Sequence, residues 1–321
     1  MPIVDKPLHE LKVYQGINPK PADFDEFWEK SLEEMRNVER NVEIIKADFQ
    51  APGSTCYDLY FTGVKGARIH SQLIVPDNIK GKAPALIQFH GYSGWTGEFC
   101  DKLNWTSCGF VVAAMDCRGQ GGYSEDVGGV KGTTQNGLII RGLDDCPENL
   151  YFRDVFLDTA ELADIIMNLE YVDETKVGVY GGSQGGGLTL ACASLEPRIA
   201  KAFADYPFLS DYKRVWEMDL AKDAYAELRT FFRNFDSRHE KEDEIFTRLG
   251  YIDIQNLTPR IKAEVTMATG LMDTICPPST QFAAFNKITS KKHSLIYPDY
   301  GHEYLRGNNE KRMEFFFDLL K

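Results

Sequence analysis

The strongest constraint on the fold is a glycine-rich turn around Ser183. Residues 177–187 read Val-Gly-Val-Tyr-Gly-Gly-Ser-Gln-Gly-Gly-Gly, so a short β-branched run ends at a serine, and a small-residue helical segment follows. A serine at the tip of so tight a turn sits in strained backbone, and side chains on its neighbours would collide with the strand or the helix. This G-x-S-x-G pattern between a strand and a helix is typical of a nucleophile elbow.

A different interpretation of the same turn is a glycine-rich loop that only packs closely or holds a phosphate group. The turn lacks the Lys-Ser/Thr ending of a P-loop, and no second glycine fingerprint with a downstream ribose-binding acid follows. The helix behind Ser183 would point free N–H groups and its positive dipole end toward the serine, where an oxyanion would form. We therefore expect Ser183 to be a nucleophile.

Composition places limits on the partners of the chain. The 321 residues suit one large α/β domain or two modest ones, and we expect a single domain spanning 1–321. The formal charge of −12 argues against nucleic acid or an anionic membrane as a partner. No run approaches 18 apolar residues, and the first residues contain no apolar core of a signal peptide. Because the seven cysteines are scattered without a C-x-x-C pair, we expect a reduced, cytoplasmic protein. No Cys/His cluster has ligand spacing, so we expect neither a metal nor another cofactor.

The arrangement of apolar runs predicts an α/β fold. An amphipathic N-terminal helix carries Phe24, Trp28 (or Phe27), Leu32 and Met35, and Trp28 is expected to clamp it to the surface. Consecutive strands without intervening helices then predict an antiparallel start to the sheet, at 42–49, 56–62 and 69–75. From residue 84 strands and helices alternate, which predicts a mostly parallel sheet with helices on both faces. The expected strands are 85–89, 110–115, the run before Ser183, 199–205, 263–269 and 294–297, and the expected helices are 97–108, 154–169, the segment after Ser183, 279–287 and 309–320.

Two segments interrupt this alternation. Residues 123–150 are rich in glycine and polar side chains and are too long for a plain connection, so we expect a functional loop. Residues 208–258 are helical, charged and aromatic, and we interpret them as a helical insertion over the catalytic edge of the sheet. A solvated spacer is the alternative interpretation of that insertion.

A nucleophilic serine needs a base, and the base needs an acid that orients it. In the α/β-hydrolase order the histidine comes last, and only His293 and His302 lie near the C-terminal end of the sequence. His302 follows a strand in a glycine-containing loop, whereas His293 begins a predicted strand beside two lysines. We therefore favour His302 as the base.

Three aspartates are candidates for the orienting acid. Asp273 ends the strand before the histidine's own strand, and Gly270 is expected to give its turn conformational freedom. Asp205 ends the strand after the elbow helix and is the second choice, while Asp299 is close to the histidine only in sequence. We favour Asp273 because a loop one strand away can meet the imidazole without distorting either strand.

The loops after the two early strands of the alternating region supply the remaining candidates. The backbone N–H groups of Tyr92 and Gln184 are expected to form the oxyanion hole, with His90 as a structural loop residue. The side chains of Tyr92, Tyr206 and Phe208 are expected to enclose a small acyl-binding pocket. Arg118, in the sequence Arg-Gly-Gln formed with Gly119 and Gln120, could contact substrate, but we favour a structural role through backbone and carboxylate hydrogen bonds.

Taken together, these motifs resemble the acetyl xylan esterase and cephalosporin-C deacetylase family, carbohydrate esterase family seven of the α/β-hydrolase superfamily. The resemblance rests on His-Gly-Tyr at 90–92, Arg-Gly-Gln at 118–120, Gly-Gly-Ser-Gln-Gly at 181–185, Asp273 and His-Glu at 302–303. It extends to the N-terminal segment at 21–28 and so covers nearly the whole chain. It implies a catalytic triad of Ser183, Asp273 and His302, with Tyr92 and Gln184 as the oxyanion hole and residues 118–120 as a structural motif.

The resemblance also implies a substrate and an assembly. It implies deacetylation of small acetylated sugars, xylo-oligosaccharides, and of cephalosporin C through an acetyl-serine intermediate, by a homo-hexamer built as a dimer of trimers. The aromatic residues of the insertion are compatible with an intersubunit surface, and a monomer that folds them onto its own sheet is the alternative. Other short-chain serine esterases, a small peptidase and a catalytically silent hydrolase-fold binding protein are the rival functions.

Overall fold

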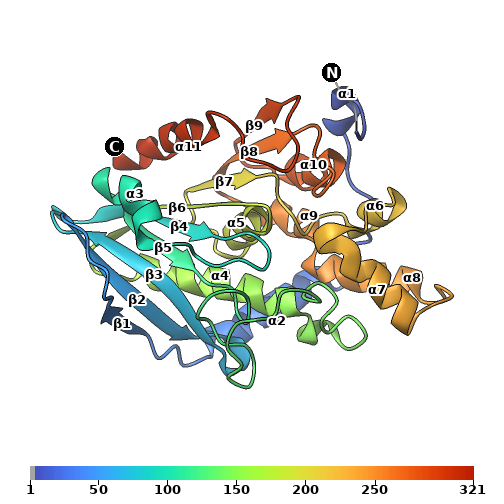
Figure 1. The fold of residues 1–321 in the computed structure, drawn as a ribbon, viewed down its shortest axis with the longest axis horizontal. Coiled ribbons are helices and arrows are strands. Elements are labelled where there is room, and N and C mark those ends of the chain that lie inside the picture. Colours follow the sequence, from blue (N-terminus) through green and yellow to red (C-terminus); the bar gives the residue numbers. More distant parts are fainter. Residues whose placement is uncertain (1–3) are drawn as a thin grey trace.

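The fold is built on one nine-stranded sheet. The computed structural model describes residues 4–321. The first three residues belong to the N-terminal segment in which we expect no signal peptide, and they lie outside the described residues. The strand order is β1-β2-β3-β5-β4-β6-β7-β8-β9 (Figure 1). The strands are β1 Glu43–Lys46, β2 Ser54–Thr62, β3 Arg68–Pro76, β4 Ala83–Phe89, β5 Val111–Met115, β6 Val172–Gly182, β7 Lys201–Asp205, β8 Glu264–Gly270 and β9 Lys292–Tyr297.

The directions of the strands confirm the predicted architecture. The pairs β1–β2, β2–β3 and β3–β5 are antiparallel, and every pair from β5 to β9 is parallel. Because parallel strands need crossover connections, a helix stands between most of the later strands in sequence. The carboxyl ends of β4 to β9 therefore meet at one edge of the sheet, and the loops that leave this edge carry the candidate site.

Helices cover both faces of the sheet, as predicted (Figure 1). One face packs against α2, α4, α5 and α10, and the other packs against α3 and α11. None of the helices within residues 4–321 is long and apolar enough to cross a membrane. The helices are α1 Leu8–Leu11, α2 Phe24–Arg36, α3 Leu103–Ser107, α4 Tyr151–Met167, α5 Gln184–Leu195, α6 Tyr212–Glu217, α7 Ala226–Phe235, α8 Glu242–Leu249, α9 Ile254–Leu257, α10 Pro278–Lys287 and α11 Asn308–Phe316.

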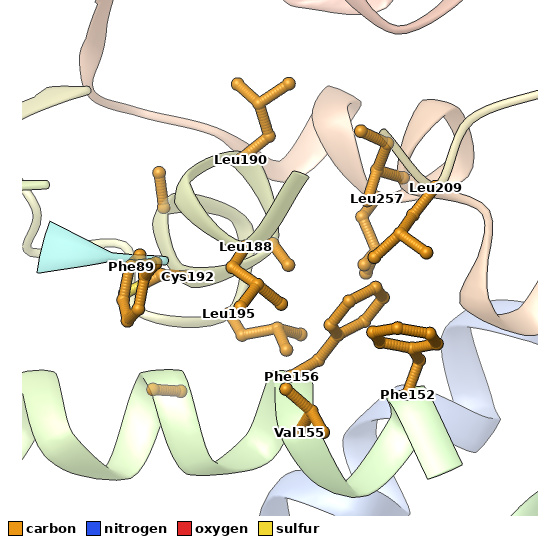
Figure 2. Close-up of a cluster of buried hydrophobic side chains, with 14 of the residues drawn as sticks. Phe89, Phe152, Val155, Phe156, Leu188, Leu190, Cys192, Leu195, Leu209 and Leu257 are labelled. Atoms are coloured by element: carbon orange, nitrogen blue, oxygen red, sulfur yellow. The ribbon is translucent and has the colours of Figure 1, made fainter. Parts of the chain in front are cut away.

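The elbow helix is held in place by a buried apolar layer. Figure 2 shows Leu188 and Leu195 of α5 beside Val155 and Phe156 of α4, and all four side chains are buried. Each fully buried side chain of this kind contributes roughly 1.5–3 kcal/mol relative to exposure. This packing fixes the start of α5, and with it the position of the preceding serine.

The N-terminal helix α2 confirms the clamp predicted for Trp28. The indole ring stacks on Phe156 of α4 with ring centroids 6.1 Å apart, and its N–H donates to the carbonyl oxygen of Tyr251 at 3.0 Å. The buried tryptophan thus joins α2 to the main domain and to the insertion.

Some predicted boundaries differ from the structure. The strand expected at 42–49 is only β1, whose four residues are all exposed at the edge of the sheet. The helix expected at 97–108 begins at Phe99 as the 3₁₀-helix Phe99–Lys102 and continues as α3. Gly97 has a φ of +74°, a conformation outside the α-helical region, so the helix cannot begin there.

Residues 208–258 are helical, as expected. They contain α6, α7, α8 and α9 with 3₁₀ turns at Asp223–Tyr225 and Gly250–Ile252. In Figure 1 these helices lie beyond the carboxyl ends of β7 and β8. Residues 123–146 contain no helix or regular strand, and the 3₁₀-helix Pro147–Asn149 ends that loop.

Candidate active site

The turn at Ser183 has the strained geometry that its glycines predict. The backbone φ and ψ of Ser183 are 58° and −120°, a sparsely populated combination for a non-glycine residue that costs roughly 1–3 kcal/mol. Its N–H donates to the carbonyl oxygen of Asp205, and its own carbonyl oxygen accepts from the N–H of Phe208, each at 3.0 Å. A Cβ atom on Gly185 would lie 2.1 Å from the carbonyl oxygen of Phe89, so only glycine fits there.

The structure brings Ser183, His302 and Asp273 together in one hydrogen-bonded chain. The Nε2 atom of His302 lies 3.0 Å from Oγ of Ser183, and its Nδ1 atom lies 2.9 Å from Oδ2 of Asp273. A carboxylate only accepts hydrogen bonds, so Nδ1 carries the proton and the lone pair of Nε2 faces the serine hydroxyl. In this tautomer His302 can take the proton from Ser183.

The Asp273 carboxylate is fully buried and held by backbone groups. Its Oδ1 atom accepts from the N–H groups of Ile275 at 2.9 Å and Cys276 at 2.8 Å. The amide of Gln281 lies 3.5 Å from Oδ2 and donates to the carbonyl oxygen of Cys276 at 2.6 Å. These contacts leave Oδ2 aimed at the imidazole, and Gln281 is a supporting residue that the sequence gave no reason to single out.

The expected role of Gly270 needs a correction. This glycine ends β8, and its φ is not in the left-handed region that favours glycine. A Cβ atom at that position would instead lie 2.4 Å from the carbonyl oxygen of Tyr300. Glycine is required there because two loops approach closely, and not because the turn needs conformational freedom.

The rival candidates for acid and base lie elsewhere. Asp205 is buried against the side chains of Asn308 and Arg312 at the base of α11. The ring of His293 is half-exposed and lies 3.0 Å from Glu264, and Asp299 is exposed. None of these three side chains makes a hydrogen bond to Ser183 or His302.

The two expected oxyanion-hole donors are both free to bind an anion. Within residues 4–321, neither the Tyr92 N–H nor the Gln184 N–H donates a hydrogen bond to a protein acceptor. Gln184 is the first residue of α5, so its N–H lies at the positive end of a 12-residue helix. The side chain of Gln184 is buried and donates to the carbonyl oxygen of His90 at 3.3 Å, which ties the two loops together.

The Arg-Gly-Gln motif contacts buried protein groups. The guanidinium of Arg118 donates to Asp158 through Nε at 2.7 Å and Nη2 at 2.5 Å, and its Nη1 donates to the carbonyl oxygen of Val64. Burial raises the pKa of Asp158 to about 6 even beside this cation. The amide of Gln120 donates to the side-chain oxygen of Gln184 at 2.9 Å, and Gly119 has a φ of +66°. A fully buried guanidinium has no access to a dissolved substrate, which favours the structural interpretation of Arg118.

Glu227 of the insertion is a contact that sequence reasoning missed. Its carboxylate accepts hydrogen bonds from the Tyr92 hydroxyl and from the N–H groups of Ile139 at 2.7 Å and Ile140 at 3.2 Å. Burial raises the pKa of Glu227, an effect that the Tyr92 hydroxyl and the backbone donors oppose. One side chain therefore joins the insertion, the loop 123–150 and the loop of the oxyanion donor.

The aromatic side chains expected around the acyl pocket lie beside the triad and its loops. The rings of Tyr206 and His302 have centroids 4.7 Å apart, and the rings of Tyr92 and Phe208 have centroids 5.5 Å apart. Burial raises the pKa of Tyr206 to about 12, so its phenol is protonated at neutral pH. Since the Tyr92 hydroxyl is bound to Glu227, the face of its ring is what remains for a substrate.

Most aromatic residues of the insertion are buried within the chain itself. Tyr212, Tyr225, Phe231 and Phe232 are at most 2% exposed, whereas Phe235 is 63% exposed. The apolar surface of the four buried aromatics is therefore used inside the subunit. Those four side chains give no support for an intersubunit surface, and the hexamer stays a prediction from the resemblance.

A possible metal-ligand set lies inside the site. One ligand atom each from Asp273, Cys276 and His302 lies within 4.8 Å of the others. No Cys/His spacing predicts this set, because His302 comes from a different loop than Asp273 and Cys276. The Asp-x-x-Cys pair at 273–276 was the available signal.

The matches with known proteins agree with this geometry. The family model for acetyl xylan esterase (AXE1) matches residues 1–319. The chain belongs to the acetyl xylan esterase family. The family and the fold together mark it as an esterase of the serine α/β-hydrolase type.

Individual relatives support the family assignment along the whole chain. Acetyl esterase Axe7A of Xylanibacter ruminicola is 30% identical over 305 residues, which cover 90% of this chain and 66% of that longer relative. Acetyl xylan esterase 1 of Thermoanaerobacterium sp. JW/SL YS485 is 59% identical, with a TM-score of 0.96 over 99% of this chain and 100% of that one. The acetyl xylan esterase of Paenibacillus sp. R4 is 35% identical, with a TM-score of 0.91 over 98% and 99% of the two chains.

Proposed function

We propose that the protein is a metal-independent serine esterase that removes acetyl groups from small acetylated sugars. The observation that carries the proposal is the chain of hydrogen bonds from Ser183 through His302 to Asp273, with separations of 3.0 and 2.9 Å. Nucleophile, base and orienting acid lie within hydrogen-bond reach, which is the geometry that acyl transfer requires. Membership in the acetyl xylan esterase family supports acetyl as the acyl group.

The reaction proceeds through an acetyl-serine in two steps. Oγ of Ser183 attacks the ester carbonyl carbon while Nε2 of His302 takes the hydroxyl proton, and the same proton then passes to the leaving sugar oxygen. In the second step His302 takes a proton from water, whose oxygen attacks the acetyl carbonyl. The proton returns to Ser183 as acetic acid leaves, and the acid then loses its own proton to solvent. Asp273 stays ionised and stabilises the imidazolium in both steps.

The oxyanion is stabilised by the two free backbone donors of the site. The Tyr92 N–H lies on the loop after β4 and the Gln184 N–H lies at the start of α5, and no protein acceptor within residues 4–321 competes for them. Removing one such donor from a serine hydrolase costs roughly 10²–10³ in kcat. Both donors are backbone groups, so side-chain substitution cannot delete them directly.

The proposed substrates are a smaller set than the esters that a serine triad can hydrolyse. The resemblance favours acetylated xylo-oligosaccharides and cephalosporin C, and the triad alone specifies acyl transfer only. The rings of Tyr92, Tyr206 and Phe208 crowd the site, so acetyl esters should turn over faster than butyryl esters. Octanoyl turnover equal to or above acetyl turnover would contradict this and indicate a general esterase.

The resemblance also supports a homo-hexamer as the working form, and the scattered cysteines support a cytoplasmic location. A ring that encloses its active sites would admit oligosaccharides and exclude polymeric xylan. This assembly is proposed from the resemblance alone.

A labelling experiment tests the central proposal. A fluorophosphonate probe should label Ser183, and both labelling and acetyl-ester hydrolysis should be lost in Ser183→Ala. Ser183→Ala and His302→Ala should each lower turnover by roughly 10⁴-fold, and the double variant should be little worse because the pair acts as one unit. An unlabelled, inactive parent would indicate a silent binding protein, and hydrolysis of peptides above esters would indicate a peptidase. A Ser183→Ala variant that kept a tenth of the parent's activity would refute the assignment of Ser183 as the nucleophile.

A further inference from the structure

A thiol lies among the catalytic groups without a role in the proposed chemistry. Cys276 is fully buried three residues after Asp273, and its backbone N–H donates to the Asp273 carboxylate at 2.8 Å. Ligand atoms of Asp273, Cys276 and His302 lie within 4.8 Å of one another. Three donor types, a carboxylate, a thiol and an imidazole, thus surround one small volume at the centre of the site.

This donor set matches the coordination chemistry of zinc. Zn²⁺ takes cysteine sulfur, histidine nitrogen and carboxylate oxygen in a tetrahedron, whereas Mg²⁺ and Ca²⁺ prefer oxygen ligands alone. Zinc–ligand bonds of about 2.0–2.3 Å place tetrahedral ligands about 3.4–3.6 Å apart. Ligand atoms within 4.8 Å therefore need to move by little more than about 1 Å to bind the ion.

We propose that Asp273, Cys276 and His302 form an inhibitory binding site for Zn²⁺ and similar thiophilic divalent cations. Metal binding at this site does not depend on the proposed esterase function. Only the inhibition that follows from binding rests on that function. The fourth position of the tetrahedron falls to water. Zinc displaces the thiol proton, because the thiolate is the form that binds the metal.

The cation binds the Nδ1 atom of His302, because Asp273 lies on that side of the imidazole ring and Nε2 faces Ser183. Its positive charge lowers the basicity that Nε2 needs to accept the Ser183 proton. A cation on Nδ1 replaces the proton that binds Asp273. The imidazole ring is 17% exposed, so a hydrated ion can reach it from solvent, although the other two ligands are fully buried.

Metal binding can be measured without reference to activity. Co²⁺ is the probe, because a cobalt–thiolate bond gives a charge-transfer absorption that a cobalt–oxygen site lacks. The parent should bind one equivalent with this absorption, and so should Ser183→Ala, which retains all three ligands. Cys276→Ala and His302→Ala should lose it, and His302 is a loop residue whose loss leaves the core packing intact. Cys192→Ala, at an equally buried thiol in α5, is the matched control and should bind like the parent.

Inhibition provides the second readout. Zn²⁺ should inhibit acetyl-ester hydrolysis by the parent, EDTA should restore it, and Mg²⁺ should have no effect at the same concentration. In Cys276→Ala the zinc concentration for half-inhibition should rise at least about tenfold, the smallest effect expected for a residue that supports a metal site. An unchanged absorption in Cys276→Ala, or zinc inhibition equal to that of the parent, would overturn the site. Inhibition by EDTA alone would also overturn it, because the metal would then be activating. Ser183→Ala has no esterase activity but keeps all three ligands, so cobalt binding by this variant tests the metal site even if the esterase assignment fails.

Discussion

Replacing Arg118 with methionine tests whether its role is structural or substrate-binding. The guanidinium is fully buried, makes two hydrogen bonds to the Asp158 carboxylate and lies 3.6 Å from Asp154. Methionine keeps much of the volume and removes the charge and all donors. The substitution therefore leaves the buried carboxylate of Asp158 without its main partner.

The expected magnitude follows from this uncompensated charge. Removing one partner of a buried ion pair costs roughly 3–5 kcal/mol of unfolding free energy. At about 2.1 cal/mol/K per residue, unfolding a chain of 321 residues has an entropy of roughly 0.7 kcal/mol/K, so Tm should fall by about 4–8 °C. Replacing Asp158 with leucine in the same protein should recover part of this loss, because no buried charge then remains unpaired at that position.

The loss of unfolding free energy in Arg118→Met should also depend on pH in a defined direction. The pKa of Asp158 is about 6 in the folded protein and roughly 3.9 in an unfolded chain, so its ionisation already disfavours the folded state as pH rises through that window. Without Arg118 the folded-state pKa moves higher, because an interaction that lowers it is lost. The variant should therefore be closest to the parent near pH 5.5 and furthest from it near pH 8.

Thermal unfolding and steady-state kinetics decide between the two roles. Arg36→Met, at an exposed position in α2, is the control and should leave Tm within about 1 °C of the parent. A structural role predicts a lower Tm with a nearly unchanged KM in the protein that remains folded. A parental Tm combined with a strongly raised KM would refute the reasoning and make Arg118 a substrate contact.

Three further predictions test the candidate site and its surroundings. Asp273→Asn should fold like the parent but lose roughly 10³–10⁴ in kcat because the wrong histidine tautomer is held, and Asp205→Asn should affect Tm more than kcat. The opposite ranking in acetyl-ester kinetics would move the acid to Asp205. Glu227→Ala should lower kcat/KM by roughly tenfold or more, since a charge-assisted hydrogen bond contributes about 1.5–3 kcal/mol, whereas Glu227→Gln should keep most activity through its remaining acceptor oxygen. Equal activity in all three proteins would show that the bridge does not position the Tyr92 loop. Light scattering should give six times the mass of one chain, and one chain's mass with full activity on polymeric xylan would exclude an enclosed ring.

The parts of the site that sequence predicts are those set by local backbone or by strand order. The conformation of Ser183 follows from its glycine neighbours, and His302 and Asp273 follow from the rule that catalytic loops leave the carboxyl ends of parallel strands. Both depend on contacts that are close in sequence or fixed by topology. The structure places all three side chains where these rules require them.

The contacts that sequence could not predict are tertiary ones between distant segments. Glu227 lies 135 residues from Tyr92, and its position on an amphipathic helix is typical of a surface glutamate. The buried aromatics of the insertion have the same composition as an intersubunit patch would have. The sequence does not show which apolar surface a helix will cover. Errors in strand boundaries have another cause: an exposed edge strand such as β1 has few contacts that would extend it.

The bridge made by Glu227 limits how the insertion can be exchanged between relatives. Its carboxylate binds the Tyr92 hydroxyl and the backbone of Ile139 and Ile140 at once. A chimera that received a foreign segment in place of 208–258 would leave three donors without their acceptor, beside the loop that carries an oxyanion donor. Recombination at the ends of that segment should therefore give folded but slow enzymes unless the glutamate, the tyrosine and the 139–140 turn travel together. In directed evolution these three elements should therefore be exchanged together, although they are far apart in the sequence.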